Sequence, residues 1–156
     1  MTLRQYTIET SSEAETAALG RRIAPQLCPA TVVPLYGDLG TGKTVLCRGI
    51  ARGLGIEAPV TSPSFTVAQE YRRPDGLWLF HLDMYRIANE EDALSFGIEE
   101  FLFSASGVTL VEWPERIAGL LEEAAGKTML MPIYLAHTAP GNRRIRVAEG
   151  LLPDDE

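Results

Sequence analysis

Residues 34–44 read PLYGDLGTGKT, and within them residues 37–44 fit the phosphate-loop template Gly-x-x-x-x-Gly-Lys-Ser/Thr. The apolar, β-branched run TVVPLY at 31–36 is typical of a buried strand and leads directly into the glycines. A helix is predicted from 43 to about 54. Strand, loop and helix in this order are the context in which such a loop holds the phosphates of a nucleotide.

The residues of the glycine loop indicate how it would bind phosphate and Mg²⁺. The backbone N–H groups of residues 39–44 are expected to surround the phosphates, assisted by the positive end of the helix. Lys43 is expected to reach the β- and γ-phosphates, and the hydroxyl of Thr44 to bind Mg²⁺. The chain contains only two lysines beside twelve arginines, and one of the two stands in the loop, where a compact ammonium is needed. Asp38 is expected to support the loop rather than to react.

The composition is that of an ordinary soluble protein. The chain has 156 residues, 46% of them hydrophobic, and a net charge of −7. We expect one domain over residues 1–156 with a frayed tail at 151–156, no secretory signal and a cytoplasmic location. A chain this acidic is not suited to coating nucleic acid, although a local basic patch would be compatible with it.

Two isolated cysteines, Cys28 and Cys47, predict neither a disulfide framework nor a metal site. Both are expected to be small buried side chains.

The remaining pattern predicts a mixed sheet. We expect a strand at 4–9 followed by a helix to about 24, one hairpin around the turn at 74–76, and a second around 139–142. One or two short helices are expected within 89–102, and a buried strand at 107–112 followed by a helix near Pro114. The predicted fold class is therefore α/β, a three-layer sandwich like that of P-loop NTPases, with parallel and antiparallel strands in its central sheet.

Two carboxylates follow apolar runs, as a phosphate loop requires. Asp83 ends LWLFHLD and Glu112 ends GVTLVE. Glu112 is the better candidate for the metal because its run resembles a parallel core strand, and Asp83 is then expected to orient the attacking water.

Several other residues allow two interpretations. The stretch TSPSFT at 61–66, with Ser62 and Ser64, could sense the γ-phosphate or could be an ordinary loop. His81 is expected to be a packed strand histidine, and Trp113 part of an aromatic core, although Trp113 could border the nucleotide.

Three arginines flank the last predicted turn: Arg143, Arg144 and Arg146. A solvated hairpin end is the favoured interpretation. A contact to phosphate, or to the acidic patch of a partner, is the alternative.

Taken together, the motifs YGDLGTGKT, TSPSFTV, HLDMYRI, EEDALSFGIEEF and LVEWPER resemble, in order and spacing, the TsaE (YjeE) family. The resemblance covers residues 3–149. Ser64 departs mildly from the family, most of whose members carry Thr there. TsaE proteins are the ATPase component of the bacterial machinery that makes threonylcarbamoyladenosine on tRNA.

This resemblance implies that the nucleotide is ATP, that Thr44 and Glu112 hold Mg²⁺, and that Asp83 is important for hydrolysis. It places adenine near Glu13. It implies TsaB and TsaD as partners, with tRNA approached only indirectly through their complex. Motif and resemblance together predict Lys43 and Asp83 as catalytic, and a nucleotide site made of Glu13, Asp38, Leu39, Gly40, Thr41, Gly42, Lys43, Thr44 and Val45.

Rival functions remain open from the residues alone. A small-molecule kinase would need a lid with arginines and an acceptor pocket, and no helical lid segment is evident. A GTPase would need Asn-Lys-x-Asp, which is absent from the sequence. A nucleotide-gated binding module would bind ATP without hydrolysing it.

Overall fold

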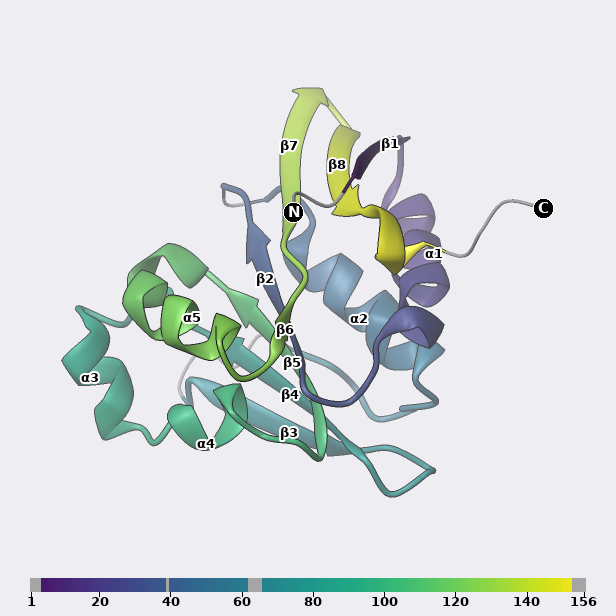
Figure 1. The fold of residues 1–156 in the computed structure, drawn as a ribbon. Coiled ribbons are helices and arrows are strands. Elements are labelled where there is room, and N and C mark those ends of the chain that lie inside the picture. Colours follow the sequence, from purple (N-terminus) through teal and green to yellow (C-terminus); the bar gives the residue numbers. More distant parts are fainter. Residues whose placement is uncertain (1–3, 39, 62–65, 153–156) are drawn as a thin grey trace.

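A twisted sheet forms the centre of the molecule in the computed structural model, which describes residues 4–38, 40–61 and 66–152 (Figure 1). Its strands are β1 (Gln5–Thr10), β2 (Thr31–Tyr36), β3 (Ala68–Arg72), β4 (Trp78–Asp83), β5 (Gly107–Glu112), β6 (Met129–Leu130), β7 (Ile133–Ala139) and β8 (Asn142–Ala148). They lie in the order β1-β8-β7-β2-β5-β4-β3, and β6 pairs with β2.

The sheet is mixed, as the sequence predicts. At its centre β2 is parallel to β5 and β7, and β4 is parallel to β5. The two predicted hairpins, β3–β4 and β7–β8, add antiparallel strands on either side, and β1 closes one edge against β8. The parallel strands end on the same side of the sheet, where the loop after β2 meets the ends of β4 and β5.

Helices cover both faces of the sheet (Figure 1). The α-helices are α1 (Glu13–Ile23), α2 (Lys43–Gly53), α3 (Glu90–Ser95), α4 (Glu99–Leu102) and α5 (Ala118–Ala125), and short 3₁₀ turns are η1 (Ala24–Gln26), η2 (Pro114–Ile117) and η3 (Glu149–Leu151). Successive residues of β2 face opposite sides: Val33 packs in the core under α1 and α2, and Val32 in the core under α4 and α5. The predicted three-layer α/β sandwich is confirmed.

Four details differ from the predicted pattern. Leu151, expected in a frayed tail, is fully buried in the core at the end of η3. The helix expected at Pro114 begins as the 3₁₀ turn η2, and α5 starts only at Ala118. The first arm of the last hairpin is broken at Met131 and Pro132, so that β6 pairs with β2 before β7 begins. Cys28 is exposed, not buried, because it lies in the turn between η1 and β2.

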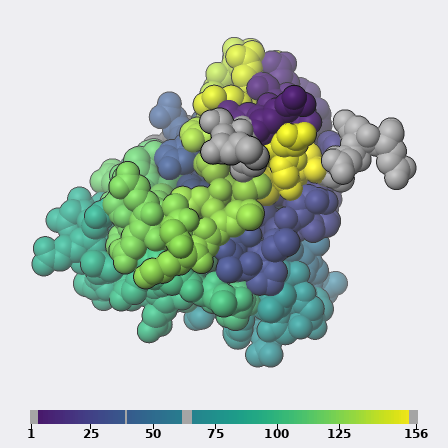
Figure 2. Space-filling model, viewed as in Figure 1, coloured from purple at the N-terminus to yellow at the C-terminus, as the bar shows by residue number. Residues whose placement is uncertain are grey.

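The two ends of the described chain lie side by side. Figure 2 shows the purple N-terminal segment packed against the yellow C-terminal segment, in agreement with the pairing of β1 with β8. This pairing places Arg143, at the start of β8, opposite Thr10, at the end of β1. The last hairpin is therefore held beside the start of α1, close to the loop after β2. No helix within the described ranges has the length and apolar character needed to cross a bilayer.

Glycines allow α1 and α2 to pack closely. A Cβ added at Gly49 would lie 2.2 Å from the carbonyl oxygen of Ala17, and one at Gly20 would lie 2.6 Å from that of Leu46. Both neighbours are backbone atoms, so a side chain at either position would force the helices apart. Because α2 follows the glycine loop directly, its seating on α1 and the sheet also fixes the loop.

We predict that Gly49→Ala destabilises the protein by about 1–3 kcal/mol, since the overpacking at Ala17 exceeds the gain in helix propensity. Urea unfolding measures the change. Gly126→Ala is the control, because Gly126 has φ −80° and its added Cβ would meet nothing closer than 3.6 Å. Equal stability of wild type and Gly49→Ala would contradict the close packing.

Candidate nucleotide site

The glycine loop, residues 37–44, turns the chain from β2 into α2. Gly40 and Gly42 have φ values of +78° and +97°, which residues with a side chain rarely adopt. Two hydrogen bonds within the loop stabilise it. Thr41 donates its hydroxyl to the carbonyl of Asp38 at 2.8 Å. Lys43 Nζ donates to the carbonyl of Gly37 at 2.6 Å. Gly42 is the N-cap of the eleven-residue α2, so the positive end of that helix faces the loop.

Lys43 is buried, with 5% of its surface exposed. Its ammonium lies 3.6 Å from the ring centroid of Trp113, a cation–π contact. Burial lowers the pKa of Lys43, and the carboxylates of Glu112, Glu115, Asp83 and Asp38 oppose that shift. The side chain therefore lies in acidic surroundings that favour its charged form.

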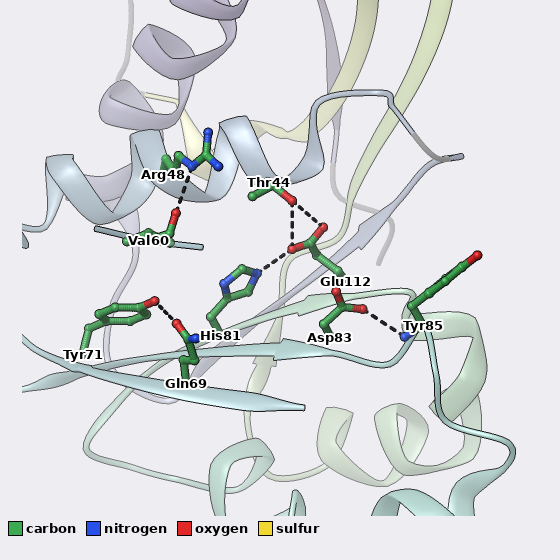
Figure 3. A network of polar contacts seen from close by, with 9 residues as sticks. All are labelled: Thr44, Arg48, Val60, Gln69, Tyr71, His81, Asp83, Tyr85 and Glu112. Atoms are coloured by element: carbon green, nitrogen blue, oxygen red, sulfur yellow. Dashed lines mark hydrogen bonds and ion pairs between the residues drawn. The ribbon is translucent and has the colours of Figure 1, made fainter. Parts of the chain in front are cut away.

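The two predicted carboxylates lie next to each other. Asp83 ends β4 and Glu112 ends β5, and the parallel register pairs these two residues directly. Thr44, in the first turn of α2, donates its hydroxyl to the Glu112 carboxylate, with Oγ1 3.2 Å from Oε1 and 3.4 Å from Oε2 (Figure 3). Asp83 Oδ1 accepts the backbone N–H of Tyr85 at 2.9 Å. Three hard oxygen donors thus come from three elements, and this donor set suits Mg²⁺.

His81 holds the Glu112 side chain in place through a polar contact. It is fully buried, as expected of a packed histidine, but its Nε2 lies 2.6 Å from Glu112 Oε2 (Figure 3). Cys47 completes a buried cluster in which one ligand atom of each residue lies within 4.8 Å of the others. Burial raises the pKa of the Cys47 thiol well above its usual value, and a protonated thiol is a poor metal ligand. The Thr44–Glu112 pair is therefore the better cation site.

Lys43, Asp83 and the Thr44–Glu112 pair line one cavity of about 400 Å³. Its walls include most of the residues that the sequence predicts for the site: Glu13, Gly40, Gly42, Lys43, Thr44, Val45, Asp83 and Glu112. The loop, the first turn of α1 and the ends of β4 and β5 thus meet at one place. An elongated anion would meet the helix end and Lys43 on one side and the carboxylates on the other.

Some predicted residues lie elsewhere. Asp38 and Thr41 line a separate groove behind the loop, beside the stacked rings of Tyr36 and Tyr134. Their contacts are internal to the loop, which fits the supporting role expected of Asp38. Leu39, and the segment with Ser62 and Ser64, lie outside the described residues.

The cavity is also lined by residues for which the sequence favours another position or no role. Trp113 is half-buried, packs against the core as expected and also lines the cavity, because its φ of +57° turns the chain sharply after β5. Tyr85 packs against it, with ring centroids 5.1 Å apart. Arg143 was expected at a solvated hairpin end, but it is buried and lines the cavity, because β1 and α1 cover it. No local signal in the sequence predicts that β1 and α1 bury Arg143.

Comparison with known proteins gives a family match for this chain. The family model described as "Threonylcarbamoyl adenosine biosynthesis protein TsaE" matches residues 10–145. This chain belongs to the TsaE family. The match spans the glycine loop, both carboxylates and the start of the last hairpin, and it confirms the resemblance drawn from the motifs.

Individual TsaE relatives are similar over nearly their whole length. The protein named tRNA threonylcarbamoyladenosine biosynthesis protein TsaE from Treponema pallidum is 39% identical, over 88% of this chain and 96% of its own. The protein of the same name from Bacillus subtilis is 37% identical, over 98% of each chain. The crystal structure of Bacillus subtilis YdiB superimposes with a TM-score of 0.71 and 33% identity, covering 94% of this chain and 86% of that one.

The two cysteines should differ sharply in reactivity. Cys28 is exposed, and Cys47 is buried beneath the site with a raised pKa. We predict that a maleimide labels one thiol per native chain, and two after unfolding, as counted by mass spectrometry. Cys28→Ser should abolish native labelling. Rapid labelling of Cys47 in the native protein would show that the packing around His81 and Glu112 is wrong.

Proposed function

We propose that this TsaE-family protein binds Mg²⁺-ATP in the cavity and hydrolyses it in support of threonylcarbamoyladenosine modification of tRNA. The observation that carries the proposal is the meeting of a buried Lys43 with the Thr44–Glu112 pair and Asp83 in one cavity. The names of the relatives from Treponema pallidum and Bacillus subtilis support the pathway. TsaB and TsaD are the proposed partners, as the family resemblance implies.

Each residue has a distinct role in this proposal. The loop amides and Lys43 bind the phosphate chain and offset its negative charge. Thr44 and Glu112 hold Mg²⁺, which when bound neutralises charge on the phosphate oxygens. Asp83 orients the attacking water, and its contact with the Tyr85 amide fixes one of its oxygens. Glu13 lies at the start of α1, on the cavity wall, and is proposed to contact adenine.

The position of Glu112 supports its assignment to the metal. His81 and Thr44 hold its carboxylate at both oxygens, so the group is oriented before any ligand arrives. Asp83 lies next to Glu112 in the register of β4 against β5, and with Glu112 assigned to the metal it is the carboxylate proposed for the attacking water. Preorganised charge of this kind supplies much of the rate enhancement in phosphoryl transfer.

We predict that Lys43→Ala weakens ATP binding by about ten- to a hundredfold, because a charge-assisted contact to phosphate is lost. Isothermal titration calorimetry measures the affinity. The only other lysine of the chain provides a control: Lys127, whose side chain is 62% exposed, and Lys127→Ala should bind ATP as wild type does. Unchanged affinity in Lys43→Ala would remove the glycine loop from nucleotide binding.

We predict that Glu112→Gln lowers Mg²⁺-dependent phosphate release by about a hundredfold while ATP binding without metal is retained. The amide keeps the size of the side chain and can still accept from Thr44. Glu123→Gln, at an exposed site on α5, is the control. Phosphate release is measured alone and with TsaB and TsaD. A kinase would instead consume ATP in proportion to an added acceptor, and a nucleotide-gated module would release no phosphate under either condition.

A further inference from the structure

One half of one sheet face is left uncovered by the helices of the described ranges. On that side α3, α4 and α5 pack over β2, β4 and β5, and none of the described residues in this core comes from β1, β7 or β8. Figure 1 shows β7 and β8 extending beyond these helices. On the opposite side Ile8, Leu135 and Ile145 of the same three strands pack against the core under α1 and α2. The alternate side chains form what we call the bare half-face: Thr7, Glu9, Tyr134, Ala136, Arg144 and Arg146.

A row of aromatic and cationic side chains crosses the border of the bare half-face. The strand registers pair Tyr36, the last residue of β2, with Tyr134, and Tyr134 with Arg146. The two rings stack, with centroids 5.0 Å apart and an angle of 13° between their planes. The guanidinium carbon of Arg146 lies 4.6 Å from the centroid of the Tyr134 ring, a cation–π contact. Both tyrosines are half-buried and Arg146 is exposed, so part of each side chain remains accessible.

This row lines the groove behind the glycine loop, which has a volume of about 440 Å³. Arg144 also lines the groove and is paired with Glu9 at 3.1 Å. None of the ion pairs found in the described parts of the chain involves Arg146. Arg146 is therefore an accessible cation for which the described chain supplies no salt-bridge partner.

We propose that the bare half-face is the docking surface for a protein partner that presents a carboxylate to Arg146 and an apolar side chain to the tyrosine pair. Tyrosine and arginine are enriched at protein interfaces and among the residues that carry most of their binding energy. The TsaB–TsaD complex is the partner assigned to this surface. The inference therefore rests on the proposed function and deepens it by naming where the partner binds.

The position of the groove suits such a partner. Gly37, Asp38 and Thr41 of the glycine loop line it together with the two tyrosines, and Gly37 directly follows Tyr36. A protein bound here would contact the loop from behind and would leave the nucleotide cavity on the other side of the loop open.

A single strand of RNA fits this surface less well. Bases do stack on aromatic rings and on arginine, but binding the phosphate backbone requires several free cations. Here Arg144 is already paired with Glu9, and the carboxylate of Asp38 lines the groove. The carboxylate of Glu115 is close enough to contribute to the raised pKa of Tyr36, after the larger effects of burial and of Tyr134. In a chain with a net charge of −7, these neighbours favour a protein partner.

The test measures binding of the full chain to the purified TsaB–TsaD complex by biolayer interferometry, with Mg²⁺ and a non-hydrolysable ATP analogue present. Arg146→Glu reverses the charge of the row, and we expect it to weaken binding by about tenfold or more. Arg22→Glu is the matched control, because Arg22 is exposed in the last turn of α1, on the opposite side of the sheet. It should bind the complex as wild type does.

A second pair of variants tests the aromatic part of the row. Tyr134→Ala removes the ring between Tyr36 and Arg146 and should also weaken binding of the complex by about tenfold. Tyr6→Ala is its control, because Tyr6 is 40% exposed and lies on the same side of β1 as Ile8, away from the bare half-face. Should Tyr134→Ala not fold, the exposed Arg146→Glu decides the question alone.

Nucleotide binding without the partner separates docking from damage to the loop. Neither Tyr134 nor Arg146 is among the described residues that line the nucleotide cavity. Calorimetric titration with the ATP analogue should therefore give wild-type affinity for both variants. A loss of analogue affinity in Arg146→Glu that matched its loss of affinity for the complex would overturn the inference.

Three further results would also overturn it. The first is wild-type affinity of Arg146→Glu for the complex, and the second is an equal loss in Arg22→Glu, which would indicate a general effect of charge. The third is a loss in Arg146→Glu confined to another ligand. That ligand would be RNA if only binding of an unmodified tRNA transcript fell, or a second copy of the chain if only self-association in sedimentation fell.

Failure of the proposed function looks different. If wild type bound the ATP analogue but not the TsaB–TsaD complex, the proposed partners would be wrong and the inference would fall with them. If wild type bound the complex and both Arg146→Glu and Tyr134→Ala bound it equally well, only the docking surface would be wrong.

Discussion

The contact between Thr44 and Glu112 joins the first turn of α2 to the carboxyl end of β5, and the geometry of the site depends on it. Three constraints bring these side chains together. The parallel pairing of β2 with β5 puts Leu35 beside Glu112, just before the loop leaves the sheet. The loop then reverses into α2, which packs on the sheet and on α1 at glycine contacts. The adjacent pairing of β4 with β5 adds Asp83 at the same edge.

The distribution of charge around this contact is unusual for a protein interior. The cavity wall contains three buried ionisable residues, Lys43, Arg143 and Glu112. A fourth buried residue, His81, lies against Glu112. Glu112 is satisfied by Thr44 and His81, and Lys43 by the Gly37 carbonyl and the Trp113 ring. Arg143 alone of these four is held mainly by one long contact to Thr16. Buried charges cost free energy, and the proposed binding of a polyphosphate with its metal ion would use those of Lys43 and Glu112.

Local signals in the sequence were enough for the parts of the site that lie within a motif. The glycine loop, the strand before it and the helix after it are continuous in the chain, so Lys43 and Thr44 could be assigned at once. Asp83 and Glu112 could be placed because each ends an apolar run, and parallel strands end at one edge. The mixed sheet followed from two turn signals, at 74–76 and 139–142.

What could not be predicted depends on contacts between distant segments. Arg143 stands beside an exposed turn in the sequence, and only the pairing of β1 with β8 buries it beside Gly42. Trp113 packs against the core as expected, but only the left-handed turn after β5 shows that it also lines the cavity. The bond from His81 to Glu112 depends on the register of β4 against β5, which no periodicity reveals. Cys28 is expected to be buried because the chain on either side of it is largely apolar. It is exposed because it lies in the turn between η1 and β2.

The most direct test of this account is a crystal structure with a non-hydrolysable ATP analogue and Mg²⁺. We expect the phosphate chain to lie in the loop with Lys43 on its oxygens, and the ion to lie between Thr44 and Glu112 with Asp83 facing it. An analogue bound elsewhere, or a loop without phosphate while both carboxylates point away, would contradict it.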